Sequence, residues 1–100
     1  MNFYEYVAAL ISENQRAARR AFHPEYHKLI KLRLYLSPVQ WVELLRDAPA
    51  GIGTDISATK HLNGAEIERD TDADQLGVLR TSVGEFFRYV PIAAPVVEET

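Results

Sequence analysis

The chain has 100 residues, a net charge of −3 at pH 7 and no cysteine. This length predicts a single domain over residues 1–100 with one hydrophobic core, and the lack of cysteine excludes disulfides and thiolate metal sites. No apolar run approaches the roughly 20 residues that span a bilayer, and the acidic N-terminal stretch differs from the basic start of a signal peptide. We therefore expect a cytoplasmic protein that does not enter a membrane.

Charge is divided unevenly along the chain. Residues 1–35 carry six basic and three acidic side chains, whereas residues 36–100 carry five basic and eleven acidic ones. Such a two-signed surface can attract partners of either sign. The isoelectric point of about 5.5 lies well below the value of about 9 that is typical of dedicated nucleic-acid-binding domains.

The first predicted elements are a helix over about residues 2–22 and a strand over residues 27–36. Asn2 fits the N-cap of the helix, with Glu5 as its reciprocal partner, and Pro24 prevents the helix from continuing. The alternation in HKLIKLRLYL is typical of a strand with one buried face. In the helix, the apolar residues that recur at helical spacing are Phe3, Val7, Leu10, Ala17 and Ala21. In the strand, the apolar residues at every second position are Ile30, Leu32, Leu34 and Leu36.

The stretch LSPVQWVELLRD predicts a second helix that ends near Asp47. Ser37 fits the N-cap, Pro38 fits the first helical position, and Gln40 completes a capping box. Trp41 falls on the apolar face of this helix, so we expect its side chain to be largely buried.

Asn63-Gly64 is the strongest turn signal in the chain, because a type I′ turn needs positive φ at both central positions. We therefore predict antiparallel strands over about residues 54–62 and 65–69. Apolar residues three and four apart predict a last helix over about residues 72–89, and residues 91–100 are expected to form an extended tail. The expected α+β fold has the order α-β-α-β-β-α and a small, mostly antiparallel three-stranded sheet packed by helices.

The middle third of the chain resembles a group of small uncharacterised proteins of tailed phages and prophages. Those proteins share a motif like LSP-x-Q-[F/W]-x-E-L-[L/I], a G-x-G loop and a short strand. The resemblance implies a phage or prophage origin and carries no known activity with it. The matching positions are Leu36, Ser37, Pro38, Gln40, Trp41, Glu43, Leu44, Gly51 and Gly53.

An acidic row occupies every second position of the stretch GAEIERDTDADQLG. Its last three members match the D-x-D-x-D start of a calcium-binding loop. However, Gln75 stands where that loop needs glycine, and Thr81 stands where it needs a closing glutamate, so we predict no metal site. The members of the row are Glu66, Glu68, Asp70, Asp72 and Asp74.

Two interpretations of the acidic row remain. In the first, Glu66 and Glu68 face solvent from a strand, and Asp72 caps the following helix. In the second, the carboxylates form a negatively charged face for a basic partner. The second interpretation predicts partner contacts at Glu66, Glu68, Asp70 and Asp74.

A basic cluster near the end of the first helix is an alternative site. Arg16, Arg19, Arg20 and Lys28 could contact the phosphates of a nucleic acid or nucleotide. The simpler interpretation is a solvated helix end whose positive charges complement the helix dipole.

Catalytic and metal-binding patterns are weak. The three histidines, His23, His27 and His61, do not have zinc-ligand spacing on one helix face. No serine lies in a nucleophile elbow, and the short GIG segment lacks the remaining residues of a phosphate-binding loop. We predict no enzymatic activity, no metal and no cofactor.

The function expected from the sequence is non-catalytic binding of a host protein in the host cytoplasm. The narrower hypothesis is a host-takeover or anti-defence inhibitor, such as an anti-CRISPR-like protein, that targets a nucleic-acid-binding complex. One alternative is a nucleic-acid or nucleotide binder that uses the basic cluster. The other is a phage structural or assembly protein that forms homo-oligomers through the first helix or residues 91–97.

Overall fold

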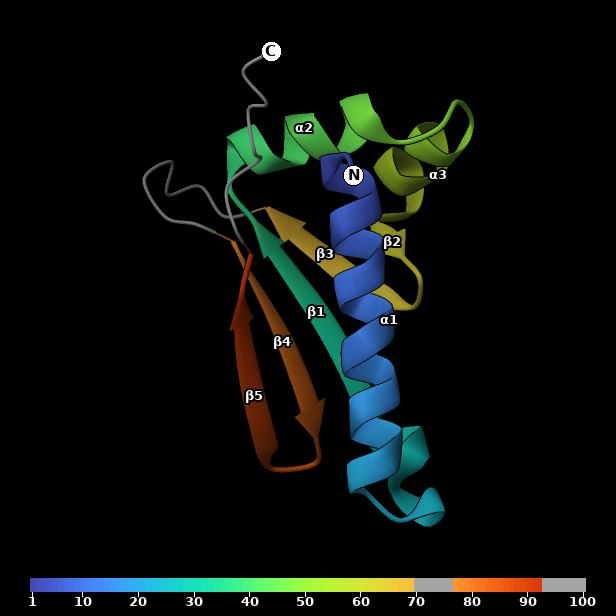
Figure 1. Ribbon diagram of the computed structural model, residues 1–100, viewed down its shortest axis with the longest axis vertical. Coiled ribbons are helices and arrows are strands. Elements are labelled where there is room, and N and C mark those ends of the chain that lie inside the picture. Colours follow the sequence, from blue (N-terminus) through green and yellow to red (C-terminus); the bar gives the residue numbers. More distant parts are fainter. Residues whose placement is uncertain (70–76, 93–100) are drawn as a thin grey trace.

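The computed structural model describes residues 1–69 and 77–92, which form an α+β fold (Figure 1). Helices and strands do not alternate regularly, because all four helical segments of the described residues precede the run of four strands that completes the sheet. In chain order, the elements are α1 (Phe3–Ala21), the 3₁₀ helix η1 (Pro24–Leu29), β1 (Ile30–Leu36), α2 (Pro38–Asp47), α3 (Ile52–Thr59), β2 (His61–Leu62), β3 (Ala65–Arg69), β4 (Val78–Val83) and β5 (Phe86–Pro91).

The strands form one mixed sheet in the order β2-β3-β1-β4-β5. The central strand β1 pairs in parallel with β3 and antiparallel with β4. Parallel neighbours need a crossover connection, and α2 and α3 lie within the connection from β1 to β3. The short strand β2 and the longer strand β5 form the two edges.

Helix α1 lies across one face of the sheet, next to β1 and β4 (Figure 1). It begins as predicted, because the Asn2 side chain accepts a hydrogen bond from the Glu5 N–H. Its apolar stripe meets the inward side chains of the strands and forms the core. The buried core cluster contains Phe3, Val7, Ile11, Leu32, Leu34, Leu36, Trp41, Leu44, Ile56, Leu62, Ala65, Ile67, Leu79 and Ile92.

The predicted capping box at the start of α2 is confirmed. Ser37 Oγ accepts a hydrogen bond from the Gln40 N–H, and Gln40 Oε1 accepts one from the Ser37 N–H. Trp41 is buried, with 8% of its surface exposed, as expected from its position in the helix. The strand that precedes α2 is shorter than predicted, since residues 24–29 form η1 and β1 starts only at Ile30.

The predicted strand over residues 54–62 is wrong in its larger part. Residues 52–59 form α3, and only His61 and Leu62 pair with β3. The turn itself is confirmed, with φ of +49° at Asn63 and +86° at Gly64. The physical reason for the error is that Ile56 is the one buried residue of α3. A single buried side chain is compatible with a short helix as well as with a strand.

The predicted helix over residues 72–89 is also wrong where the structure describes it. Residues 78–83 and 86–91 form β4 and β5, joined by a two-residue turn at Gly84 and Glu85. Gly84 has φ of +60°, and Glu85 does not have positive φ, which is the pattern of a type II′ hairpin. The sheet therefore has five strands in the described residues, not three.

Several predictions fall outside the described residues. The calcium and partner interpretations of Asp70 and Asp74, and the cap interpretation of Asp72, belong to the segment 70–76. Most of the expected tail belongs to residues 93–100.

Candidate functional site

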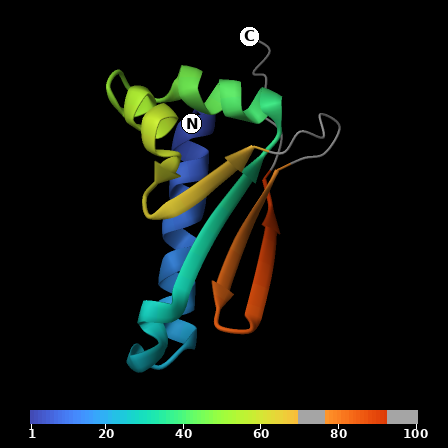
Figure 2. The same ribbon diagram turned by 180° about the vertical axis from the view of Figure 1, so that it is seen from behind.

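The two faces of the sheet differ. Successive side chains of a strand point to opposite faces, and α1 covers the face that carries Leu34 and Leu79. No helix in the described part of the chain covers the opposite face, which we call the open face (Figure 2). By strand register, the open face contains Lys31, Arg33 and Tyr35 of β1, Glu66 and Glu68 of β3, Val78, Arg80 and Ser82 of β4, and Phe87, Tyr89 and Pro91 of β5.

One half of the open face is an ion-pair network on β1 and β3. Arg33 contacts Glu66 Oε2 at 2.9 Å and Glu68 Oε1 at 3.1 Å, while His61 Nε2 lies 3.9 Å from Glu66. The hydrogen bond with Glu66, followed by contact with Tyr35 and the charge of Glu68, raises the pKa of Arg33 above its ordinary value. The two glutamates predicted to contact a partner therefore lie side by side, and each also has a structural partner.

The other half of the open face is aromatic. The guanidinium carbon of Arg80 lies 5.7 Å from the ring centroid of Tyr35 and 5.7 Å from that of Phe87, within the range of cation–π attraction. Phe87 and Tyr89 remain 57% and 59% exposed. Together, Tyr35, Arg80, Phe87 and Tyr89 form what we call the aromatic half of the open face.

Arg80 also has an unpaired polar atom. Its Nε is buried and has no hydrogen-bond partner among the described residues. No carboxylate in residues 1–69 or 77–92 forms an ion pair with this side chain. A partner that places a carboxylate near the guanidinium would form the ion pair that Arg80 does not make within the described residues.

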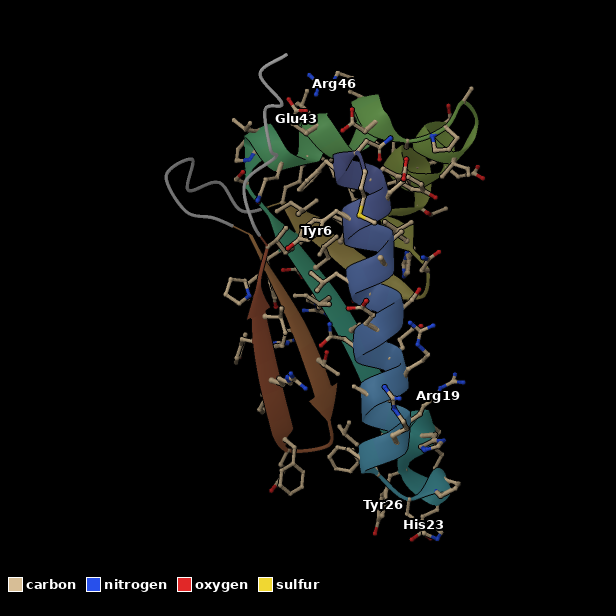
Figure 3. The ribbon with its side chains drawn as sticks, in the orientation of Figure 1. Tyr6, Arg19, His23, Tyr26, Glu43 and Arg46 are labelled. Atoms are coloured by element: carbon tan, nitrogen blue, oxygen red, sulfur yellow. The ribbon has the colours of Figure 1, made fainter. Side chains whose placement is uncertain are left out.

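The basic cluster lies elsewhere. Arg16, Arg19 and Arg20 belong to the second half of α1, and Figure 3 shows Arg19 on the side of that helix that faces away from β4 and β5. Lys28 belongs to η1. Because α1 packs on the face of the sheet opposite to the open face, its arginines and the open face do not combine into one surface.

The histidines do not gather into a site. His27 Nε2 bonds with the carbonyl oxygens of Arg19 and Phe22, at 2.8 and 3.0 Å, at the end of α1. His23 contacts Glu25 in the neighbouring 3₁₀ helix, whereas His61 belongs to β2. Within residues 1–69 and 77–92, no group of three or more histidine or acidic side chains could hold a metal ion.

Sequence reasoning missed the aromatic half because it assigned Arg80, Phe87 and Tyr89 to a helix. A signal was nevertheless present. Gly84 followed by Glu85 lies between two segments rich in β-branched and aromatic residues, a pattern that favours a hairpin. Correct assignment as strands would have placed Phe87 and Tyr89 on one face.

Comparisons with known proteins give no family for this chain. No protein-family model, no curated protein and no solved structure matches it. In the part of the chain that the structure describes, no helix is long and apolar enough to cross a membrane.

Proposed function

We propose that this protein is a non-catalytic binding protein that recognises another protein through its open face. The aromatic half carries the proposal. Arginine and large aromatic side chains are enriched at the centres of protein–protein interfaces and contribute most of the binding energy there. Here Arg80 lies within cation–π distance of Tyr35 and Phe87. Phe87 and its neighbour on the same face, Tyr89, are more than half exposed.

The ion-pair network is the second part of the proposed contact. Glu66 and Glu68 present their remaining carboxylate surface on the same face as Arg80. A partner with a basic group near these glutamates and an acceptor near Arg80 would match both halves. Complementary charges of this kind mainly increase the association rate and select the correct partner.

A protein partner is favoured over a nucleic acid. Aromatic rings beside cations can stack on single-stranded bases, so the aromatic half alone fits both classes. However, Arg33 is already paired with two carboxylates, and those carboxylates would repel phosphates along the same face. The isoelectric point of about 5.5 supports the same choice.

The resemblance of the segment LSPVQWVELL to tailed-phage proteins supports a bacterial host protein as the partner. The narrower proposal is that binding inhibits a host complex, as a host-takeover or anti-defence factor would. Acidic surface near Glu66 and Glu68 would then compete with nucleic acid for a basic surface of the target.

Affinity capture from a bacterial lysate tests the proposed function. The tagged protein is compared with a variant that carries Arg80→Ala and Phe87→Ala, and the bound proteins are identified by mass spectrometry. We expect a specific host protein to be captured by the parent and lost by the double variant. Capture of the same protein by both would contradict the assignment to the open face.

A matched control removes exposed apolar surface elsewhere. Val39 and Val42 on α2 are 61% and 60% exposed, so Val39→Ser with Val42→Ser should leave capture unchanged.

Fluorescence anisotropy with a single-stranded oligonucleotide tests the alternative that the protein binds nucleic acid. Salt-sensitive oligonucleotide binding that Arg80→Ala abolishes would favour a nucleic-acid binder instead.

A further inference from the structure

The edge strand β5 has backbone groups that point away from the sheet. In an antiparallel ladder, hydrogen-bonded and non-hydrogen-bonded pairs alternate. The 2.9 Å bond from the Ile92 N–H to the Gly77 oxygen shows that these two residues form a hydrogen-bonded pair. Counting along the register of β4 and β5 from this pair, Pro91, Tyr89 and Phe87 belong to non-hydrogen-bonded pairs. The N–H and C=O of Phe87 and Tyr89 therefore point outward, as does the C=O of Pro91, which has no N–H. In the described sheet, no strand lies beyond β5 (Figure 1).

A groove lies next to this edge, between β5 and the second half of α1. Its volume is about 240 Å³, and its lining is mostly apolar. The apolar lining includes Ala17 and Ala21 of α1, Phe22 directly after that helix, and Phe86 of β5. The rings of Phe22 and Phe86, which both line the groove, lie 5.9 Å apart. An apolar cavity of about 150 Å³ accepts a benzene ring, so this groove can take a large apolar side chain.

The groove also contains an unpaired polar group. Thr81 lines it and is 7% exposed, and its Oγ1 has no hydrogen-bond partner among the described residues. Buried hydroxyl groups normally have a partner. Arg88 lies on the same rim, and no carboxylate of residues 1–69 or 77–92 pairs with it.

The positive charge of Arg88 distinguishes two kinds of strand that could pair with β5, namely the β5 strand of a second copy of the chain and an acidic segment of another protein. If two copies of the chain paired through β5 so that Phe87 of each met Tyr89 of the other, Arg88 would lie opposite Arg88. Like charges directly opposite each other destabilise a strand pair. A segment with a carboxylate opposite Arg88 would instead be stabilised there, so an acidic partner strand is favoured over a second copy.

Building on the proposed protein-binding function, we propose that β5 binds an extended segment of the partner as an added antiparallel strand. The outward groups of Phe87 and Tyr89 form the backbone hydrogen bonds, as in other cases of strand addition to a sheet edge. An apolar side chain of the segment enters the groove beside α1, and a carboxylate two positions away along the segment meets Arg88.

Selection from a library of displayed random peptides tests this proposal, followed by calorimetric titration of the enriched peptides. We expect the enriched peptides to alternate apolar and acidic side chains on one face. Tyr89→Pro removes an outward N–H without breaking the β4–β5 ladder, because Pro91 already occupies an equivalent position. This variant should bind the peptides about tenfold more weakly or worse.

The matched control is Tyr89→Ala, which keeps the N–H and should bind more tightly than Tyr89→Pro. Arg88→Glu should change the selected acidic residue to lysine or arginine. The absence of enriched peptides, or equal binding by Tyr89→Pro and the parent, would overturn the proposal. So would a dimer in solution that Tyr89→Pro dissociates.

The two failures can be told apart. If lysate capture is lost with Arg80→Ala and Phe87→Ala while the peptide results are negative, the open face binds the partner and the added strand is wrong. If lysate capture does not depend on the open face while the peptides behave as expected, the edge strand binds and the open-face proposal is wrong.

Discussion

The side-chain oxygen of Gln40 accepts a 2.8 Å hydrogen bond from the Gly77 N–H, which joins the start of α2 to the start of β4. The same side chain bonds the Ser37 N–H through Oε1 and donates from Nε2 to the Ile92 oxygen. Gln40 is 2% exposed. One buried amide therefore holds together the capping box and the ends of β4 and β5.

Gln40→Leu should be strongly destabilising. The substitution retains volume but leaves the Ser37 and Gly77 N–H groups and the Ile92 carbonyl without a partner. Since each buried unsatisfied group costs about 1–3 kcal/mol and three groups are affected, we expect a loss of at least about 3 kcal/mol in the free energy of unfolding, measured by urea titration. Gln15→Leu is the control, because the Gln15 bond to the Asn63 oxygen is exposed, and it should cost less than about 1 kcal/mol.

Gly77→Ala should be destabilising for a steric reason. A Cβ at this position would lie 2.4 Å from the Tyr35 oxygen and 2.5 Å from Gln40 Oε1. The first of these is backbone and cannot rotate away, so we expect a cost of about 1–3 kcal/mol. Thermal unfolding followed by circular dichroism measures it, and a melting temperature equal to that of the parent would contradict the close contact.

Trp41→Ala should remove a large part of the stability. Trp41 is buried in the core cluster, and Lys60 and Arg69 lie 6.0 and 5.7 Å from its ring. Truncating a buried tryptophan costs about 3–5 kcal/mol, which is a large share of the stability of a small domain. Trp41 is the single tryptophan of the chain, so its fluorescence follows unfolding of the parent, and circular dichroism follows the variant. A loss below about 1 kcal/mol would show that the side chain is not part of the core.

The elements that sequence predicted well have local physical causes. Asn2 caps α1, Ser37 and Gln40 form their capping box, and Asn63 with Gly64 makes the expected turn. Each of these signals depends on residues within a few positions of one another. The same is true of the alternation that identified β1.

The missed elements depend on distant partners. Leu79 and Val83 are four residues apart, which fits a helix, but they are also an even number apart, which fits one face of a strand. The choice is made by pairing with β1, where Leu79 lies opposite Leu34, far away in the sequence. The parallel pairing of β1 with β3 is likewise set by packing, so the sequence did not reveal that Arg33 would meet Glu66.

The network of Arg33 with Glu66 and Glu68 allows a test by charge. Glu66→Lys with Glu68→Lys would place three cations together on neighbouring strands. We expect the melting temperature of this variant to fall at low salt and to recover as salt is added, because salt screens repulsion over a Debye length of about 10 Å at 0.1 M. Thermal melts at low and high ionic strength measure the effect.

Glu66→Gln with Glu68→Gln separates stability from recognition. Exposed ion pairs contribute little to stability, so this variant should melt close to the parent at any salt concentration. If the partner places a basic group against the two glutamates, the association rate should fall, and the difference from the parent should shrink as salt is added. Surface plasmon resonance with the captured partner measures both rates. Equal association rates for variant and parent at low salt would leave the ion-pair network with a structural role only and confine recognition to the aromatic half.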